Sequence, residues 1–405
     1  MEQVILFIFS ILLISFMLRI VFGFIQIPKL LAPIFVGILF QLLYPTQLQE
    51  SLDLINFLAE FGIIMLLFYI GLEVNISKFT KKYKETLGVA FIDFLTTFVI
   101  SFFVCYFALG YDWITSFVIA SVLSITAEGV AVLLLKENRL LKSKMGELVV
   151  GAGMIDDIIG IIILLFLSII ISYQTFSIVI LLPFILGILI MTILFYFINR
   201  ISNIIDFVFI RDSFIKYPSE LLTLSILFLL SFALFTQIIN LEFTIGAIMA
   251  GLLLNFSLKN KSRKGAREEG EVKRIISNVT FGFLIYFFLF WIGIQFDISN
   301  ISQSIVLGIF FAILAFGGKF LGSLLSEHRY KESFKDSLLT GIGLSSKGGI
   351  DLVIIAIAKN AGLINEEIFS SLVIMSILLT FFVPIIFNYF VKRNKTYKKH
   401  NIVNT

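Results

Sequence analysis

Charged side chains are scarce in this 405-residue sequence, where Lys, Arg, Asp and Glu together make up only 14% of the residues. Soluble domains carry about 25% charged residues. Hydrophobic residues make up 59% of the chain, and its mean hydropathy is +1.04. This composition excludes a soluble globular protein. It predicts an integral membrane protein throughout, without an appended globular domain.

Cysteine and histidine are also rare. The single cysteine, Cys105, excludes an intramolecular disulfide, and His328 and His400 are expected to be solvated loop residues. No P-loop or other nucleotide motif occurs, which argues against a nucleotide-driven pump and against a nucleotide, nucleic acid or cofactor as partner. The first apolar run has no basic n-region and no small-residue cleavage site, so we expect a retained helix rather than a signal peptide.

Apolar runs of bilayer length follow one another along the whole chain and predict about thirteen transmembrane helices. They fall at 3–24, 30–46, 54–74, 87–109, 112–136, 146–171, 177–198, 219–238, 241–257, 274–296, 301–325, 334–358 and 366–391. Lys and Arg gather in every second loop, namely 78–84, 136–144, 200–216, 259–274, 328–335 and 392–399. Loops that are rich in Lys and Arg stay in the cytoplasm, which predicts an external N-terminus and a cytoplasmic C-terminus.

Two stretches of the chain repeat each other. Leu66–Ser77 reads LLFYIGLEVNIS and Phe288–Ser299 reads FLFWIGIQFDIS, while Pro33–Gly37 is echoed by Ala247–Gly251. The repeated helices are an odd number of spans apart, so the second copy runs through the membrane in the opposite sense. The sequence therefore predicts an inverted repeat of about six helices, the architecture of secondary transporters, whose site lies at the repeat interface.

Adjacent carboxylates, Asp156 and Asp157, interrupt an otherwise apolar run. One aspartate in the middle of a bilayer helix costs on the order of 3 kcal/mol or more. One interpretation is a pair of buried salt bridges to Lys319 and Lys347. The interpretation we favour is a site for a monovalent cation, because carboxylate oxygens suit Na⁺ or Li⁺ and a carboxylate withdrawn from water readily exchanges a proton.

Small polar residues and glycines occur at mid-membrane depth in two further runs, Ser124–Val130 (SITAEGV) and Leu344–Asp351 (LSSKGGID). Glycines and hydroxyls at that depth are typical of discontinuous helices, whose freed backbone groups need partners. Glu128 and Lys347 occupy equivalent repeat positions, so they are expected to neutralise half-helix dipoles or each other. Pairing of Lys347 with Asp351, four residues on, is the alternative.

A second pair of opposite charges, Asp93 and Lys319, also occupies equivalent positions of the repeat. Lys319 lies midway along its run, too far from either end to reach water, so it must be paired or neutral. Its candidate partners are Asp93 and one of Asp156 and Asp157. Asp93 is an additional intramembrane acid whose role the sequence leaves open.

These motifs together resemble those of the second family of bacterial cation–proton antiporters, in the branch with paired aspartates. That branch includes sodium/proton antiporters and potassium-efflux relatives. The resemblance rests on Leu58–Glu73, Thr126 with Leu135–Glu137, Gly153–Asp157, Gly246–Leu253 and Gly318–Gly322. Two features depart from the family pattern. Lys347-Gly348-Gly349 stands where arginine, glycine and glutamate are usual, and Glu128 occupies an often apolar position.

The resemblance implies an exchanger of protons for Na⁺ or Li⁺ in a bacterial inner membrane. Asp157 would be the principal cation ligand, with Thr126 nearby, and Asp156 would pair with Lys319 and release it as ions exchange. Ser345, Ser346, Lys347, Asp351 and Glu128 would compensate the broken helices. Two acidic groups would allow two protons per cation, which makes transport electrogenic.

The resemblance also implies a division into domains in a homodimer, with an elevator-like movement of the core against the dimer. Residues 1–86 and 219–300 would form the dimerisation domain, 87–171 and 301–391 the core, 172–218 a linker helix with a cytosolic loop, and 392–405 a cytosolic tail. A K⁺/H⁺ antiporter of the same fold is the alternative. A cation channel or a sodium-coupled solute symporter is less consistent with one asymmetric acidic pair.

Overall fold

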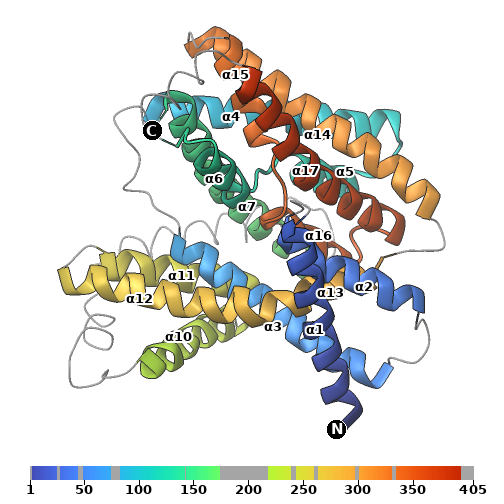
Figure 1. Ribbon diagram of the computed structural model, residues 1–405, viewed down its shortest axis with the longest axis vertical. Coiled ribbons are helices and arrows are strands. Elements are labelled where there is room, and N and C mark those ends of the chain that lie inside the picture. The colour runs from blue at the N-terminus through green and yellow to red at the C-terminus, as the bar shows by residue number, and fades with distance from the viewer. Residues whose placement is uncertain are drawn as a thin grey trace. The chain divides into compact units, whose positions relative to one another are not determined.

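The computed structural model describes residues 2–24, 28–43, 49–73, 83–141, 143–173, 218–238, 243–259, 263–296, 301–330 and 334–393. Every regular element in these ranges is helical (Figure 1). Eight of these helices are long and apolar enough to cross a membrane, and shorter apolar helices accompany them. The all-α membrane class predicted from the sequence is therefore confirmed. The expected helix 177–198 and the loop after it lie outside the described residues.

The bounds of the elements follow the predicted runs closely. The longer helices are α1 (Glu2–Phe24), α3 (Gln49–Glu73), α4 (Tyr83–Phe103), α7 (Lys144–Tyr173), α10 (Pro218–Ile238), α14 (Ile301–Tyr330) and α17 (Glu366–Arg393). The shorter ones are η1 (Lys29–Leu31), α2 (Ala32–Leu43), η3 (Val104–Ala108), α5 (Trp113–Ser124), α6 (Glu128–Glu137), α11 (Phe243–Lys259), α12 (Arg263–Val279), η5 (Thr280–Leu284), α13 (Ile285–Ile294), α15 (Phe334–Leu344) and α16 (Ile350–Asn360).

One boundary differs from the sequence prediction. The stretch 259–274 was expected to be a basic loop, but α12 begins at Arg263 and continues through η5 into α13. Lys, Arg and Glu are good helix formers, so a charged stretch can extend a transmembrane helix beyond the hydrocarbon. The apolar part of such a stretch indicates where the membrane begins, but it does not indicate where the helix begins.

The helices fall into two compact units, each assembled from separate parts of the chain. One unit contains Met1–Met17, Pro33–Val74 and Ile161–Ile294, and the other contains Leu18–Ala32, Asn75–Gly160 and Gln295–Thr405. In the first unit α3 packs against α11 and α13, and α10 packs against α11. In the second, α14 is central and packs against α4, α15 and α17, while α5 contacts α4 and α16.

The inverted repeat is visible in two close helix contacts of the first unit. A Cβ added to Gly37 would lie 2.2 Å from the carbonyl oxygen of Phe290 and 2.8 Å from the Cα of Gly293. A Cβ on Gly71 would lie 2.5 Å from the Ile248 carbonyl and 3.0 Å from the Cα of Gly251. These two glycine pairs join α2 to α13 and α3 to α11, and the sequence repeat relates one pair to the other. Small residues allow such close backbone approach in membranes.

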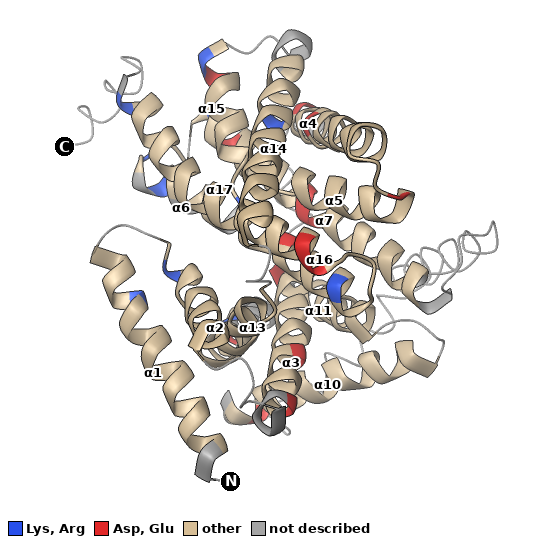
Figure 2. Cartoon of the chain, turned by 90° about the vertical axis from the view of Figure 1, so that its right-hand side faces the viewer, with Lys and Arg blue, Asp and Glu red and all other residues tan. Residues whose placement is uncertain are grey.

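Charged residues are sparse along the described helices, and several of them are buried. Figure 2 shows ribbons that are almost wholly tan, with blue and red at isolated positions. Five of the described charged side chains in the second unit are at most 1% exposed, namely Asp93, Asp156, Lys319, Lys347 and Asp351. A buried charge is stable only with partners, so the contacts of these side chains define the candidate site.

Candidate ion-binding site

The helix expected at 112–136 is interrupted as the sequence predicts. Its first half, α5, ends at Ser124, and its second half, α6, begins at Glu128. The connecting residues are extended, with ψ of 141° at Ile125 and 96° at Ala127. Thr126 lies between them and is fully buried. The interruption leaves backbone carbonyls at the end of α5 and N–H groups at the start of α6 without partners inside the helix.

The helix expected at 334–358 is interrupted in the same way. Its halves are α15, which ends at Leu344, and α16, which begins at Ile350. Gly348 has a φ of +108°, a conformation that residues with a Cβ rarely adopt. In the Lys347-Gly348-Gly349 sequence, Gly348 therefore allows the backbone conformation of the interruption, and Lys347 supplies a charge.

The two interruptions cross and bond to each other. The Ala127 N–H donates to the Ser346 carbonyl (2.8 Å), and the Ser346 hydroxyl donates to the Ala127 carbonyl (3.1 Å). The Thr126 hydroxyl donates to the Leu344 carbonyl (2.6 Å). Ser345 serves its own helix, because its hydroxyl donates to Gly341. These hydroxyls replace hydrogen bonds that an unbroken helix would have made.

Among the described residues, Lys347 binds backbone carbonyls. Its ammonium donates to the carbonyl oxygens of Val122 (2.8 Å) and Leu123 (3.0 Å), and also to that of Ile125. These carbonyls form the carboxyl end of the half-helix α5, which carries the negative end of its dipole. Of the two alternatives from the sequence, neutralisation of a half-helix dipole describes this geometry. The side chain of Glu128 lies outside the described residues.

Asp351 binds the backbone N–H groups at the start of α16, as Lys347 binds the carbonyls at the end of α5. Its carboxylate accepts hydrogen bonds from the N–H groups of Gly349 (2.6 Å) and Gly348 (3.0 Å), and one from the Ser376 hydroxyl (2.8 Å). On the same helix as Ser376, the Thr380 hydroxyl donates to the Lys347 carbonyl (3.0 Å). Sequence reasoning missed these two α17 residues. Their spacing of one helical turn was the available signal.

Lys319 contacts two carboxylates at once. Its Nζ lies 2.9 Å from Oδ2 of Asp156, to which it donates a hydrogen bond, and 2.7 Å from Oδ2 of Asp93. All three side chains are buried from solvent. The sequence left the partner open between Asp93 and one of the paired aspartates. The structure brings Lys319 to Asp93 of α4 and to Asp156 of α7 together.

The two adjacent aspartates have different surroundings. Asp156 is 1% exposed and points to Lys319, whereas Asp157 is partly exposed. This difference follows from their helix positions, because neighbouring side chains point about 100° apart. Gly160, one turn further along α7, would bring a Cβ to 3.0 Å from Ile350 and 3.5 Å from Ile125, so α7 packs beside both interruptions. No group of three or more His, Cys, Asp or Glu with the geometry to hold a metal ion occurs in the described part of the chain.

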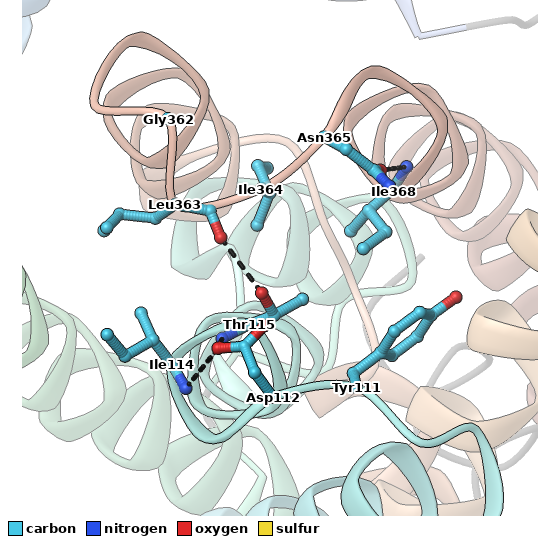
Figure 3. A pocket seen from close by; sticks show the side chains of 9 residues that line it. All are labelled: Tyr111, Asp112, Ile114, Thr115, Gly362, Leu363, Ile364, Asn365 and Ile368. Carbon is cyan, nitrogen blue, oxygen red and sulfur yellow. Dashed lines mark hydrogen bonds between the residues drawn. The ribbon is translucent and has the colours of Figure 1, made fainter.

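A separate pocket of about 360 Å³ lies where the loop before α5 meets the loop between α16 and α17. Figure 3 shows Asp112 capping α5 through the N–H groups of Ile114 and Thr115, and the Thr115 hydroxyl bonded to the Leu363 carbonyl. Asn365 caps α17 through the Ile368 N–H. Burial raises the pKa of the Tyr111 phenol, which therefore stays neutral. The polar groups of this pocket close helix ends, so the candidate ion site remains the one around Asp156.

Three comparisons with known proteins are consistent with this geometry. The sequence model of the transmembrane sodium/hydrogen exchangers matches residues 9–392. An Na⁺/H⁺ antiporter of Enterococcus hirae is 26% identical over 354 residues, which cover 84% of this chain and 86% of that protein. The K⁺/H⁺ antiporter 1 of Saccharomyces cerevisiae is 29% identical over 404 residues, which cover 92% of this chain but 44% of the yeast protein.

Among solved structures, the sodium proton antiporter MjNhaP1 from Methanocaldococcus jannaschii has a similar fold. The TM-score is 0.67, and the match covers 95% of this chain and 96% of that chain at 15% sequence identity. At this identity the similarity concerns the fold alone. It supports the all-helical membrane fold predicted from the sequence.

Proposed function

Because the chain belongs to the family of transmembrane sodium/hydrogen exchangers, we propose that it is a secondary antiporter that exchanges protons for Na⁺ or Li⁺. The observation that carries this proposal is the buried ion pair of Lys319 with Asp156, next to Asp157 on the same helix. A charge pair in hydrocarbon is expensive, and it is retained where it can be exchanged for a substrate ion.

Asp157 is the principal cation ligand in this proposal. Its partial exposure lets an ion reach it, whereas Asp156 is held by Lys319. The Thr126 hydroxyl donates its proton to Leu344, so its oxygen lone pairs remain able to accept a cation. Carboxylate and hydroxyl oxygens are hard ligands, and a desolvated carboxylate also binds protons, so cation and proton compete for the same groups.

Binding of the cation draws Asp156 away from Lys319. On the return step Asp156 and Asp157 carry two protons in place of the one cation, and loss of these protons restores the ion pair of Asp156 with Lys319, so each cycle moves net charge. The second compact unit contains the candidate site and is the moving core in this proposal, and the first unit supplies the dimer contacts. The protein resides in a bacterial inner membrane with its N-terminus outside and its C-terminus in the cytoplasm, as the basic loops favour.

The direct test is an ion panel in everted membrane vesicles that contain the protein and carry an imposed pH gradient. Addition of Na⁺ or Li⁺ is expected to dissipate the gradient, which a pH-sensitive dye reports as dequenching. K⁺ at the same concentration is expected to give little response. Vesicles without the protein are the control. No response to any monovalent cation would refute antiport, and the same result is expected of a symporter that needs an organic solute.

A K⁺/H⁺ antiporter is the second candidate, because the yeast relative that matches 92% of this chain carries that name. The site does not favour either ion by composition, since both bind oxygen ligands. A response to K⁺ alone in the vesicle panel would select this candidate. A channel would instead conduct a cation without moving protons, so cation flux with an unchanged pH gradient would identify it.

Replacement of Lys319 by Gln is expected to reduce the dependence of transport on membrane potential. Without the lysine, Asp156 and Asp93 are left as two carboxylates in one buried site and retain a proton between them. Asp156 then no longer exchanges its proton, and one proton moves per cation. Proteoliposomes with an imposed potential measure the change, since each charge moved contributes about 2.3 kcal/mol per 100 mV. Unaltered potential dependence would mean that the lysine is only structural.

A further inference from the structure

Lys319 has one more counterion than the exchange at Asp156 and Asp157 requires. Its ammonium lies 2.7 Å from Asp93 and 2.9 Å from Asp156, and all three side chains are buried. If all three groups are ionised, the cluster carries a net charge of −1. Both contacts are ion pairs, and the ammonium also donates a hydrogen bond to Asp156. Lys319 thus lies between two carboxylates on different helices, Asp93 and Asp156.

The position of Asp93 is built into the packing of α4 against α14. Two glycines of α14, one residue before and three after Lys319, face α4. A Cβ on Gly322 would lie 2.6 Å from the Asp93 Cα, and one on Gly318 would lie 2.9 Å from the Thr97 Cα. The Thr97 hydroxyl also donates to the Asp93 carbonyl (2.9 Å). The two glycines let the helix backbones approach closely enough for Asp93 to touch Lys319.

Both carboxylates keep unused accepting capacity. The Oδ1 atoms of Asp93 and Asp156 are buried and accept no hydrogen bond from the described residues. Such an atom is costly in a purely structural ion pair, where each oxygen should find a donor. Buried acceptors without donors are expected where the partners change during function. The Lys319 ammonium can therefore move from one carboxylate to the other and remain paired.

We propose that Asp93 is a positioning residue that serves as the second counterion of Lys319 and keeps the lysine paired while Asp156 turns to the transported cation. This inference rests on the proposed function, in which Asp156 releases Lys319 when the cation binds. A lysine left alone in the membrane core would oppose that release, because an unpaired buried charge is far less stable than a paired one. Asp93 removes this penalty and so sets the apparent affinity for the cation.

The test is the KM for the transported cation in Asp93→Asn. Without the second counterion, the cation must break the only ion pair of Lys319, so KM is expected to rise about tenfold or more at constant pH. The pH profile of transport is expected to move toward alkaline pH, because a higher pH helps to neutralise the unpaired lysine. Asp93→Glu keeps the charge and is expected to restore most of the affinity.

Ser101→Ala is the matched control, because Ser101 is a buried polar residue two turns after Asp93 on α4. Its KM and pH profile are expected to equal those of the wild type. In a Lys319→Gln background, Asp93→Asn is not expected to raise KM, since no ammonium is left for Asp93 to pair with. An unchanged KM and pH profile in Asp93→Asn, or an equal effect in both backgrounds, would overturn the proposal.

Unfolding in detergent separates this proposal from the function itself. Thermal unfolding of the wild type, Asp93→Asn, Lys319→Gln and the double variant forms a cycle that needs no transport. The two single changes are expected to be strongly non-additive, because each removes the same ion pair. If the wild type moves no cation but the cycle shows coupling, the proposed function fails while the pairing stands. Additive effects in the cycle would overturn the pairing of Asp93 with Lys319.

Discussion

Asp157→Asn is expected to lower cation-driven proton transport by about 100-fold or more, which leaves no measurable response in the vesicle assay. The amide keeps the shape of the side chain but removes the negative charge that a monovalent cation needs in a low-dielectric site. Charged hydrogen-bonding groups contribute about 1.5–3 kcal/mol each, and 2.8 kcal/mol corresponds to about a hundredfold in binding. Asp157 is partly exposed, so the change should not disturb the packing of α7.

The control for this prediction is Asp112→Asn. Asp112 accepts hydrogen bonds from Ile114 and Thr115 as the N-cap of α5, away from the buried charges. Asparagine caps helices as well as aspartate does, so transport is expected to remain near the wild-type rate. Both variants should show the unfolding temperature of the wild type in detergent. Full cation-driven dequenching in Asp157→Asn would remove this residue from the site and move the assignment to Asp156.

Lys347→Met is expected to destabilise the protein by about 3 kcal/mol or more and to abolish transport with it. The variant leaves the carbonyls of Val122, Leu123 and Ile125, at the carboxyl end of α5, without the donor that Lys347 supplies. A buried acceptor that loses its partner costs about 1–3 kcal/mol, and more when the donor was charged. Thermal unfolding in detergent measures the loss, and the vesicle assay measures its consequence.

Two variants show whether the effect comes from the bonds of Lys347. Lys347→Arg keeps the charge and the donors, so it is expected to retain more stability than Lys347→Met. Lys359→Met removes a lysine from the same half of the chain, but that lysine pairs with Glu366, whose side chain is 69% exposed. An exposed pair contributes about 0–1 kcal/mol. Equal losses of stability in Lys347→Met and Lys359→Met would show that the stability of the protein does not depend on the bonds of Lys347 to the end of α5.

The sequence predicts the helices and the repeat because few types of residue are stable in the hydrocarbon of a membrane. Any charge, hydroxyl or glycine pair at mid-membrane depth stands out, which is why the sequence alone indicates Asp156, Lys319 and the two interruptions. The pairing of Gly37 with Gly293 and of Gly71 with Gly251 was not stated from the sequence. It nevertheless follows from the repeat once the two helix pairs are seen in contact.

The contacts of the buried charges could not be predicted from the sequence and are seen only in the tertiary structure. From the sequence, Lys319 had several candidate acids, and Lys347 had Glu128 or Asp351 as an ion-pair partner. Asp93 and Asp156 are 63 residues apart in the chain. Asp93 reaches Lys319 because two glycines bring α4 close to α14, whereas Asp156 reaches it from α7. Helix periodicity tells which face of a helix is polar, but the separation and rotation of two helices depend on side-chain packing.

The order of residues alone thus predicts a protein that spans the membrane with an inverted repeat, two broken helices and a few intramembrane charges. These conclusions rest on composition and spacing, which the transfer free energy between water and hydrocarbon makes informative. Two features depend on how the helices pack in space: Lys347 binds the carbonyls at the end of α5, and Lys319 is shared by Asp93 and Asp156. Hydrogen bonds and ion pairs form over about 3 Å, and one sequence does not determine helix positions to that distance.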